Sequence, residues 1–391
     1  MCAMRVSHVI TRLIVGGAQE NTIASVLGLR GKPGLTVDLL SGPTTGSEGS
    51  LEPAVTAVPG LLTRIPTLIR AVNPWLDWLA ARQLTRWFAE HRPDIVHTHS
   101  GKAGVLGRLA ARRARVPLVI HSIHGPSFGP FQGLLKNEIF RAAERRAGRV
   151  TDHFVVVALA MRDQYLRAGI GSPGQYTRIF SGFDLDPFLK AQRETDLAQR
   201  LGFTPDDFVV GKIARLFELK GHDDLFAAAP ELCRRIPNLK LLLVGDGPDR
   251  ERLSRVAETG VLRDRVAFAG LVPPAEVGRY VAQMDTLVHL SRREGLPRAI
   301  PQALAAGKPV VAYDCDGAGE ACLPGETGFL VAPGDLESLV TRLGMLADAP
   351  ELREELGANG REFVRQRFSV RTLVDEQYQL YQRLWSARKR R

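Results

Sequence analysis

The stretch S-R-R-E-G-L-P-R-A-I-P-Q-A-L-A-A-G-K-P-V-V-A-Y-D, from Ser291 to Asp314, decides the fold. It follows a short apolar run, Thr286 to Leu290, that is typical of a buried strand, and it ends in a second such run, Val310 to Tyr313. Between the two runs, Pro297 suits the first turn of a helix and Gly307 suits its end. Two apolar strands joined by a helix predict a parallel sheet that is covered on both faces.

Apolar runs of this kind alternate with helical patterns along the whole chain, which predicts an α/β protein with doubly wound parallel sheets. At 391 residues the chain is too long for one typical core, so we expect two domains, residues 1–184 and 185–371. The boundary lies in the stretch S-G-F-D-L-D-P, which interrupts regular structure. The expected strands are residues 6–14, 35–40, 94–97, 118–122, 154–157, 178–180, 209–214, 239–244, 266–269, 286–290, 310–313 and 328–331.

The same stretch predicts a binding site. A helix N-terminus offers free N–H groups and partial positive charge, so it suits an anion. The carboxylate of Glu294, just before the expected helix, suits hydroxyl groups, although it could also act as a helix cap. In open α/β sheets, ligands bind outside the carboxyl ends of the strands, where Glu294 is expected to lie. An anion beside hydroxyl groups describes a nucleotide sugar.

Two other places combine a strand end with suitable residues. Arg215 and Lys220 flank the end of a strand and the start of a helix, so they can neutralise a leaving diphosphate, unless they are ordinary surface charges. Gly16 and Gly17 follow the first strand and permit close approach of a phosphate or sugar, although a tight turn explains them equally well. No G-x-G-x-x-G motif follows the first strand, which argues against a dinucleotide oxidoreductase.

The segment around Glu294 resembles the E-G-(F/L)-P signature of the family 4 glycosyltransferases. These are retaining enzymes of the GT-B fold, in which two Rossmann-like domains face each other across a cleft. The resemblance covers nearly the whole chain in the expected order. Its other motifs are G-G-A (16–18), D-I-V-H-T-H-S (94–100), I-H-S-I-H-G (120–125), S-G-F-D (181–184), A-R-L-F-E-L-K-G-H (214–222), V-G-D-G-P (244–248), G-A-G-E (317–320) and T-G-F-L-V (327–331).

The resemblance implies roles for single residues. Arg215 and Lys220 match the cations that grip the donor diphosphate, Glu294 matches the carboxylate that contacts sugar hydroxyls, and His124 matches the histidine that reaches the donor sugar. Where the family usually has a second Glu that holds the ribose, this chain has Gln302, a neutral and weaker partner. The resemblance also implies that a last helix, about residues 372–391, crosses back to the first domain. The expected donor-binding residues are Gly16, Gly17, Gly295, Leu296, Pro297 and Gln302.

The implied reaction is the retaining transfer of a hexose from a nucleoside diphosphate sugar to an acceptor hydroxyl, with no metal and no further cofactor. The acceptor would be a saccharide or a lipid-linked saccharide in the biosynthesis of polysaccharide, lipopolysaccharide or glycolipid. Two alternatives remain. One is a nucleotide-sugar epimerase or hydrolase of the same fold, and the other is a non-catalytic nucleotide-sugar-binding relative, which Gln302 suggests.

A metal site is the less favoured interpretation of two other patterns. His97, His99, His121 and His124 are expected at the ends of two neighbouring strands, but the carboxylate closest in sequence, that of Asp94, lies at the opposite strand end. The run D-C-D, Asp314 to Asp316, looks like the D-x-D metal motif of the other glycosyltransferase fold, yet it follows a buried strand and enters a loop. We therefore expect no bound metal.

The formal net charge of +10 lies wholly in residues 1–184, which hold 22 basic against 12 acidic residues. A solvated helix face would explain this, but a surface for anionic lipid or for a phosphate-bearing acceptor is favoured. The helix that carries Arg108, Arg112 and Arg115 is the expected contact. The stretch 61–88, with three tryptophans beside arginines, fits a core helix or an interfacial one. No nucleic-acid motif accompanies the charge.

Other features concern the location of the protein. No apolar run approaches the ~18 residues of a membrane span. The four cysteines, Cys2, Cys233, Cys315 and Cys322, show neither zinc spacing nor a disulfide framework, which fits a reducing cytosol. We expect a cytoplasmic protein, either free or peripheral on the inner face of the cytoplasmic membrane.

Overall fold

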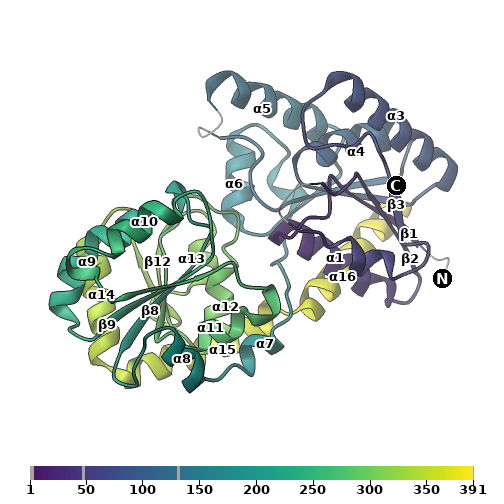
Figure 1. The fold of residues 1–391 in the computed structure, drawn as a ribbon. Coiled ribbons are helices and arrows are strands. Elements are labelled where there is room, and N and C mark those ends of the chain that lie inside the picture. The colour runs from purple at the N-terminus through teal and green to yellow at the C-terminus, as the bar shows by residue number, and fades with distance from the viewer. Residues whose placement is uncertain (1–3, 46–48, 130–132, 391) are drawn as a thin grey trace. The chain divides into compact units, whose positions relative to one another are not determined.

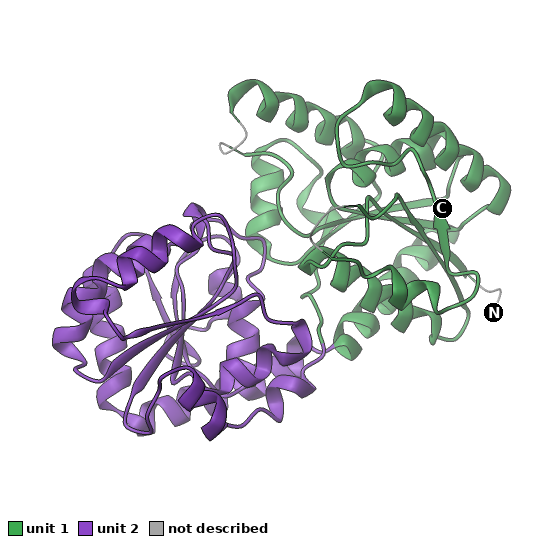
Figure 2. Ribbon diagram, in the orientation of Figure 1, with its two compact units in different colours: residues 1–183, 370–391 green, residues 184–369 purple. Residues whose placement is uncertain are grey.

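The computed structural model describes residues 4–45, 49–129 and 133–390. The chain divides into two compact units, which Figure 2 shows in two colours. Unit 1 comprises Met1–Phe183 with Val370–Arg391, and unit 2 comprises Asp184–Ser369. The boundary predicted from the sequence lies one residue after this division. Cys2 lies outside the described residues.

The described part of unit 1 holds a seven-stranded parallel sheet of order β3-β2-β1-β4-β5-β6-β7 (Figure 1). The order reverses between β1 and β4, which makes their carboxyl ends the topological switch point. The strands are β1 (Met4–Ile10), β2 (Leu35–Ser41), β3 (Leu62–Arg64), β4 (Ile95–His99), β5 (Leu118–Ile123), β6 (His153–Val156) and β7 (Tyr176–Arg178). The helices are α1 (Gly17–Arg30), α2 (Glu52–Thr56), α3 (Pro74–His91), α4 (Gly101–Arg113), α5 (Leu134–Gly148), α6 (Leu159–Arg167), the 3-10 turn η2 (Pro173–Gln175) and α16 (Val370–Lys389).

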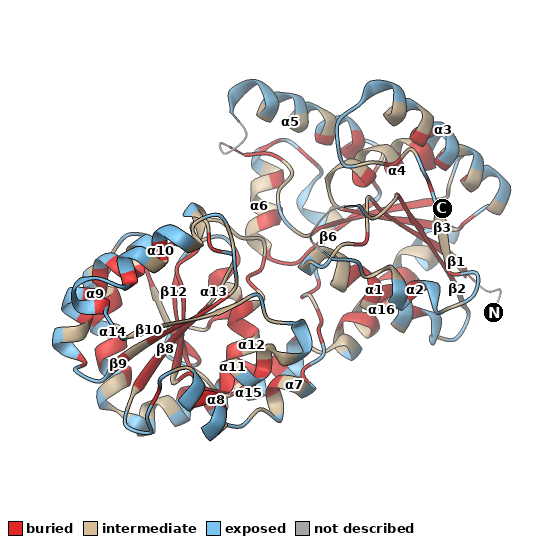
Figure 3. Ribbon diagram, in the orientation of Figure 1, coloured by how far each residue is buried: buried red, intermediate tan, exposed pale blue. Residues whose placement is uncertain are grey.

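Helices cover both faces of this sheet. On one face α3 and α4 bury Leu84 and Ala110 against Val9 and Val96. On the other face α1 and α16 close a second core with the strands. The last helix fits α1 closely, because a Cβ on Gly28 would lie 2.3 Å from Val374 Cγ2. Figure 3 shows the strands as mainly buried and the outer surface of α5 as mainly exposed.

The described part of unit 2 holds a six-stranded parallel sheet of order β10-β9-β8-β11-β12-β13, with its switch point between β8 and β11. Helices α9 and α14 pack their leucines over one face of this sheet. The strands are β8 (Phe208–Ile213), β9 (Leu239–Val244), β10 (Val266–Gly270), β11 (Thr286–His289), β12 (Val310–Tyr313) and β13 (Gly328–Val331). The helices are α7 (Asp186–Leu189), α8 (Thr195–Arg200), η3 (Glu218–Lys220), α9 (His222–Arg235), α10 (Arg250–Ala257), η4 (Gly260–Leu262), η5 (Pro274–Glu276), α11 (Val277–Ala282), α12 (Ala299–Ala305), α13 (Ala318–Ala321), α14 (Leu336–Asp348) and α15 (Pro350–Arg367).

Two doubly wound parallel sheets confirm the predicted fold class, and some local predictions need correction. The stretch 61–88 is not one helix, because it begins with strand β3 and α3 starts only at Pro74. The Asn73 side chain caps α3 by accepting hydrogen bonds from the amides of Trp75 and Leu76, both at 3.1 Å. Strand β1 was predicted to reach residue 14, but it ends at Ile10. Ile10 pairs with Ser41, the last residue of the neighbouring strand β2.

The helix of the deciding stretch also starts later than predicted. Pro297 is not in its first turn, because α12 begins at Ala299 after Arg298. The physical reason is Pro301, which has no N–H and cannot donate to the carbonyl of Pro297. The first helical bond therefore runs from the Gln302 amide to the Arg298 carbonyl, at 3.1 Å.

Candidate functional site

The switch point of unit 2 brings Lys220 and Glu294 together. Lys220 ends η3, which follows β8, and Glu294 lies in the loop after the neighbouring strand β11. The Lys220 ammonium forms an ion pair with Glu294 Oε1, and both side chains are largely buried. The backbone amide of Glu294 donates to Asp316 Oδ2 at 2.8 Å. The D-C-D segment therefore contributes a carboxylate that fixes the Glu294 loop.

A glycine makes this approach possible. Gly221 follows Lys220 with φ at +65°, and a Cβ on it would lie 2.1 Å from the carbonyl oxygen of Leu290, at the end of β11. A side chain at this position would therefore push the loop after β8 away from β11. The contact is reinforced by the amide of Arg292, which donates to the Leu219 carbonyl at 2.9 Å.

The carboxyl group of Glu294 is ionised at neutral pH. Burial alone would raise its pKa, but the contacts with His289 and Lys220 outweigh burial and lower the pKa to about 2. Burial lowers the pKa of His289, whose Nε2 lies 3.4 Å from Glu294 Oε1, so this imidazole is neutral. The full positive charge beside Glu294 is thus that of Lys220. The Glu294 carboxylate contacts the side chains of Lys220 and His289 and not the amides at the start of α12. Glu294 is therefore not a cap of that helix.

The other predicted residues of unit 2 lie around this pair. Arg215 is exposed, with its guanidinium 5.7 Å from the ring centre of Phe217, and it has no ion-pair partner among the described residues. Gln302 lies half-buried in α12, and its side-chain amide has no hydrogen-bond partner in the described parts of the chain. Gly295 is half-buried, while Leu296 and Pro297 are buried. Arg215 and Gln302 are therefore available to a ligand.

Two basic groups at this site were not predicted. Lys212 on β8 is only 2% exposed, and burial together with the charge of Lys220 lowers its pKa to about 7. His289 at the end of β11 was missed as well. Val210, two residues before Lys212, lies in the core on one face of β8. Side chains two residues apart lie on the same face of a strand, so this spacing was the signal in the sequence that Lys212 is buried.

Unit 1 has its own pocket at the switch point, of about 490 Å³. Thr11 and Arg12, which follow β1, and Ser100 to Lys102, which follow β4, line it. Gly16 precedes α1, whose N-terminus has no side-chain cap, and a Cβ on Gly16 would meet only the flexible Gln19 side chain. Gly17 is the first residue of α1. Ser100 has φ at +62°, a strained value for a residue with a side chain, which is common near binding sites.

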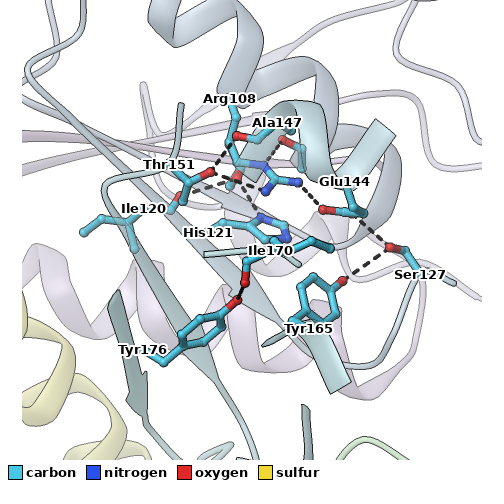
Figure 4. Close-up of polar contacts among 12 residues, drawn as sticks. Arg108, Ile120, His121, Ser127, Glu144, Ala147, Thr151, Tyr165, Ile170 and Tyr176 are labelled. Carbon is cyan, nitrogen blue, oxygen red and sulfur yellow. Dashed lines mark hydrogen bonds and ion pairs between the residues drawn. The ribbon is translucent and has the colours of Figure 1, made fainter. Parts of the chain in front are cut away.

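The wall of this pocket depends on a buried ion pair, and here a prediction was wrong. Arg108 of α4 is fully buried, so it does not face solvent. Figure 4 shows its guanidinium pointing toward Glu144. Its Nη2 donates to Glu144 Oε2 of α5 at 2.5 Å, and its Nε donates to the Gly104 carbonyl at 2.8 Å. Glu144 Oε1 accepts from Ser127 Oγ at 2.9 Å, and both Ser127 and Glu144 line the pocket. Arg108 therefore holds the pocket wall and offers nothing to a membrane.

The four predicted histidines divide between the two faces of the sheet. His121 lies on one face, where its Nδ1 bonds with Thr98 Oγ1 at 2.9 Å. His97 and His99 lie on the other face, and His124 follows β5. His8 of β1, which the sequence did not single out, completes this group, because it pairs with His97 in the sheet register.

Nitrogen atoms of His8, His97 and His99 lie within 4.8 Å of one another, which would suit a metal ion. However, both ring nitrogens of each of these histidines have hydrogen-bond partners, so no lone pair is left for a metal. No carboxylate belongs to this cluster in the described residues. The donor set fits a hydrogen-bonded chain better than a metal centre.

Two doubly wound parallel sheets in one chain, each with its own switch point, are the architecture of the GT-B fold. Residues 16–179 match the model of the glycosyl transferase 4-like domain, and residues 193–363 match that of the glycosyl transferases group 1. The chain is 31% identical to the GDP-mannose-dependent alpha-(1-6)-phosphatidylinositol monomannoside mannosyltransferase of Mycolicibacterium smegmatis, over 80% of this chain and 81% of that protein. The chain therefore belongs to the family 4 glycosyltransferases.

Other relatives agree with this assignment. The chain is 28% identical to the Escherichia coli UDP-Gal:alpha-D-GlcNAc-diphosphoundecaprenol alpha-1,3-galactosyltransferase, over 81% of this chain and 82% of that enzyme. The crystal structure of Anabaena Alr3699/HepE in complex with UDP has the same fold, with a TM-score of 0.80 and 23% identity over 97% of this chain and 100% of that chain. None of the helices in the described residues is long and apolar enough to span a bilayer.

Proposed function

We propose that the protein transfers a hexose, with retention of anomeric configuration, from a nucleoside diphosphate sugar to a hydroxyl group of a lipid-linked saccharide. The observation that carries this proposal is the Lys220–Glu294 pair at the switch point of unit 2, with the exposed guanidinium of Arg215 over the same Phe217 ring as Lys220. Cations suit the diphosphate, and an ionised carboxylate suits sugar hydroxyls. The names of relatives support the donor class, since they include UDP-galactose and GDP-mannose.

The chemistry asked of these residues is mainly electrostatic. The bond from the anomeric carbon to the phosphate oxygen breaks, the acceptor oxygen bonds to that carbon, and the departing phosphate takes the acceptor proton on the same face. Lys220 and Arg215 stabilise the charge that develops on the diphosphate, so no metal is needed. A preorganised group of this kind contributes about 3–4 kcal/mol, or a hundredfold to a thousandfold in rate. Glu294 would bind sugar hydroxyls of the donor.

The pocket of unit 1 suits an acceptor that carries both phosphate and lipid. Arg12 and Arg70 supply positive charge to its lining, whereas Lys102 and Asp77, which also line it, form an ion pair with each other. Val72 and Ile139 also line it and are 70% and 56% exposed, so the rim is apolar. Acceptors named for relatives include a diphosphoundecaprenol-linked sugar and a phosphatidylinositol mannoside. The proposed setting is the biosynthesis of cell-surface polysaccharide, lipopolysaccharide or glycolipid.

This pocket also suggests where unit 1 would meet an anionic membrane. Leu134 and Leu135, at the start of α5, are 90% and 75% exposed. They follow β5 and so lie at its carboxyl edge, as the pocket does. By contrast, Arg112 and Arg115 precede β5 and lie at the opposite edge of the sheet. We therefore place the peripheral contact with the inner face of the cytoplasmic membrane at the α5 edge rather than on Arg112 of α4 or on Arg115, which lies beyond the end of α4 and not on that helix as predicted.

The test is turnover of the variants Lys220→Ala and Arg215→Ala with a panel of nucleotide sugars and lipid-linked acceptors, with analysis of the product's anomeric configuration. Each variant should lose about a hundredfold or more in turnover. Arg342→Ala is the matched control, since its guanidinium also stacks on a phenylalanine ring, that of Phe329 at 4.8 Å. Near-normal activity of both site variants would remove the diphosphate assignment. Donor consumption at full rate without any acceptor would instead favour an epimerase or hydrolase.

A further inference from the structure

A continuous chain of hydrogen bonds runs through the core of unit 1. It starts at Ser122 Oγ, which lies 2.7 Å from His97 Nε2. The other ring nitrogen of His97, Nδ1, lies 2.5 Å from the hydroxyl oxygen of Tyr381, which α16 contributes. The same hydroxyl lies 3.4 Å from His8 Nε2. Residues of β5, β4, β1 and α16 are thus linked through one tyrosine hydroxyl.

The second half of the chain leads to the carboxyl edge of the sheet. His8 Nδ1 lies 2.9 Å from His99 Nε2, and His99 Nδ1 lies 3.1 Å from His124 Nε2. The chain ends there, because His124 Nδ1 is buried and has no hydrogen-bond partner among the described residues. His124 is the residue that resemblance assigns to the donor sugar, so the free end of the chain lies at a proposed site.

All the imidazoles of the chain are neutral at pH 7. Burial lowers the pKa of His8 to about 3 and that of His124 to about 4. Burial also holds the pKa values of His97 and His99 well below 6.5, with a smaller contribution from neighbouring histidines. A neutral imidazole carries one N–H and one lone pair, so each ring donates one hydrogen bond and accepts one. The whole chain can therefore point in only one of two directions.

Tyr381 selects between the two directions. A phenol O–H is a stronger hydrogen-bond donor than the N–H of a neutral imidazole, so Tyr381 donates in its shorter contact, to His97 Nδ1. Its oxygen then accepts from His8 Nε2–H, and His8 Nδ1 accepts from His99 Nε2–H. His99 Nδ1 in turn accepts from His124 Nε2–H, which leaves a lone pair on His124 Nδ1.

We propose that this chain fixes His124 in the Nε2–H tautomer, so that its Nδ1 accepts a hydrogen bond from a hydroxyl of the transferred sugar. Tyr381, His8 and His99 are then positioning residues that act through His124. The nature of the ligand rests on the proposed function, whereas the tautomer does not. A buried nitrogen without a partner is unfavourable, and a sugar hydroxyl would remove that penalty.

The direct test is the tautomer in the full-length wild-type protein, labelled with ¹⁵N-histidine and observed through two-bond ¹H–¹⁵N correlations. The nine histidines are few enough to assign, with His124→Gln identifying the signals of His124. We expect Nε2 of His124 to be protonated and Nδ1 to show the shift of an unprotonated nitrogen. A protonated Nδ1 would overturn the proposal, whether or not any transferase activity is found.

Tyr381→Phe removes only the hydroxyl and tests how the direction is set. We expect the ¹⁵N shifts of His124 to move towards a mixture of tautomers, and kcat/KM with the active donor to fall about five- to tenfold, the loss of roughly one hydrogen bond. Tyr176→Phe is the matched control, because it removes a hydroxyl of the same unit that donates to the Ile170 carbonyl at 2.7 Å. It should leave the His124 signals unchanged.

Three other outcomes are decisive. Unchanged His124 tautomer signals in a folded Tyr381→Phe protein would refute the role of Tyr381. One equivalent of zinc in purified protein, lost in His8→Gln, would show a metal centre in place of the chain. If Tyr381→Phe does not fold, the wild-type spectrum alone decides, and an unprotonated Nδ1 of His124 supports the proposal.

Discussion

Replacing Arg108 with alanine should destabilise unit 1 by about 3–5 kcal/mol, the usual cost of removing one partner of a buried ion pair. The side chains of Arg108 and Glu144 are 0% and 1% exposed, so removal of the guanidinium leaves a buried carboxylate without its cation. In the variant, Glu144 keeps its hydrogen bond from Ser127 but loses its cation. For a unit of about 200 residues, this corresponds to a fall of roughly 6–20 °C in midpoint temperature.

The four tryptophans make the measurement specific to unit 1. Trp75, Trp78, Trp87 and Trp385 all belong to unit 1, so tryptophan fluorescence follows the unfolding of this unit while unit 2 is silent. Urea titrations at pH 7.5 should show a lower midpoint at an unchanged slope for Arg108→Ala. The separate signal also avoids treating a two-unit chain as a single two-state transition.

Two companion variants sharpen the test. Arg112→Ala, on the same helix but exposed, should change stability by less than about 0.5 kcal/mol. The double variant Arg108→Met with Glu144→Leu should recover most of the loss, because an apolar pair leaves no unpaired charge in the core. A loss below about 1 kcal/mol for Arg108→Ala would refute the reasoning, and so would a double variant no more stable than the single one.

Other predictions concern the proposed chemistry. Glu294→Gln should weaken calorimetric binding of the nucleotide sugar more than that of the free nucleoside diphosphate, and equal losses would contradict its sugar role. The pKa of Glu294, about 2 instead of 4.5, means that the contacts of its ionised carboxylate with His289 and Lys220 stabilise unit 2 by about 3 kcal/mol above pH 4.5. This contribution should vanish as the pH falls from 4.5 towards 2, so urea unfolding followed by circular dichroism should show a weaker acid dependence in Glu294→Gln. Activity should survive dialysis against a chelator, and a loss that added metal reverses would disprove the metal-free mechanism. Leu134→Ser with Leu135→Ser should reduce sedimentation with anionic vesicles more than Arg112→Gln with Arg115→Gln, and the reverse order would return the membrane contact to α4.

The sequence predicted the strands best where both faces of the sheet are covered. The bounds of β9, β12 and β13 were predicted without error, because each is a mainly apolar run flanked by turn residues. Strand β3 was missed, since its three residues lie in a mixed apolar and basic stretch and are ordered by pairing with β2. The start of α12 was predicted too early, because Pro301 has no N–H to donate to the carbonyl of Pro297, four residues before it.

The residues of the candidate site could be predicted from the sequence where a charged side chain closely follows the end of an expected strand. Lys220 and Glu294 were named from their motifs, and the structure pairs them. His8 could not be found in this way, since its place beside His97 depends on β1 and β4 being neighbours in the sheet. Arg108 looked like part of a solvated basic run, and only the approach of Glu144, 36 residues later, explains its burial.

The return of α16 to unit 1 has a consequence for the order of biosynthesis. A ribosome releases Asp184–Ser369 before it releases the helix that unit 1 needs, so unit 2 can fold while unit 1 still lacks a wall of its core. Until Val374 and Tyr381 emerge, the apolar face of α1 stays uncovered and the histidine chain has no tyrosine hydroxyl. A product truncated before Val370 would therefore carry a complete unit 2 beside an unfinished unit 1, a clear substrate for chaperones and proteases.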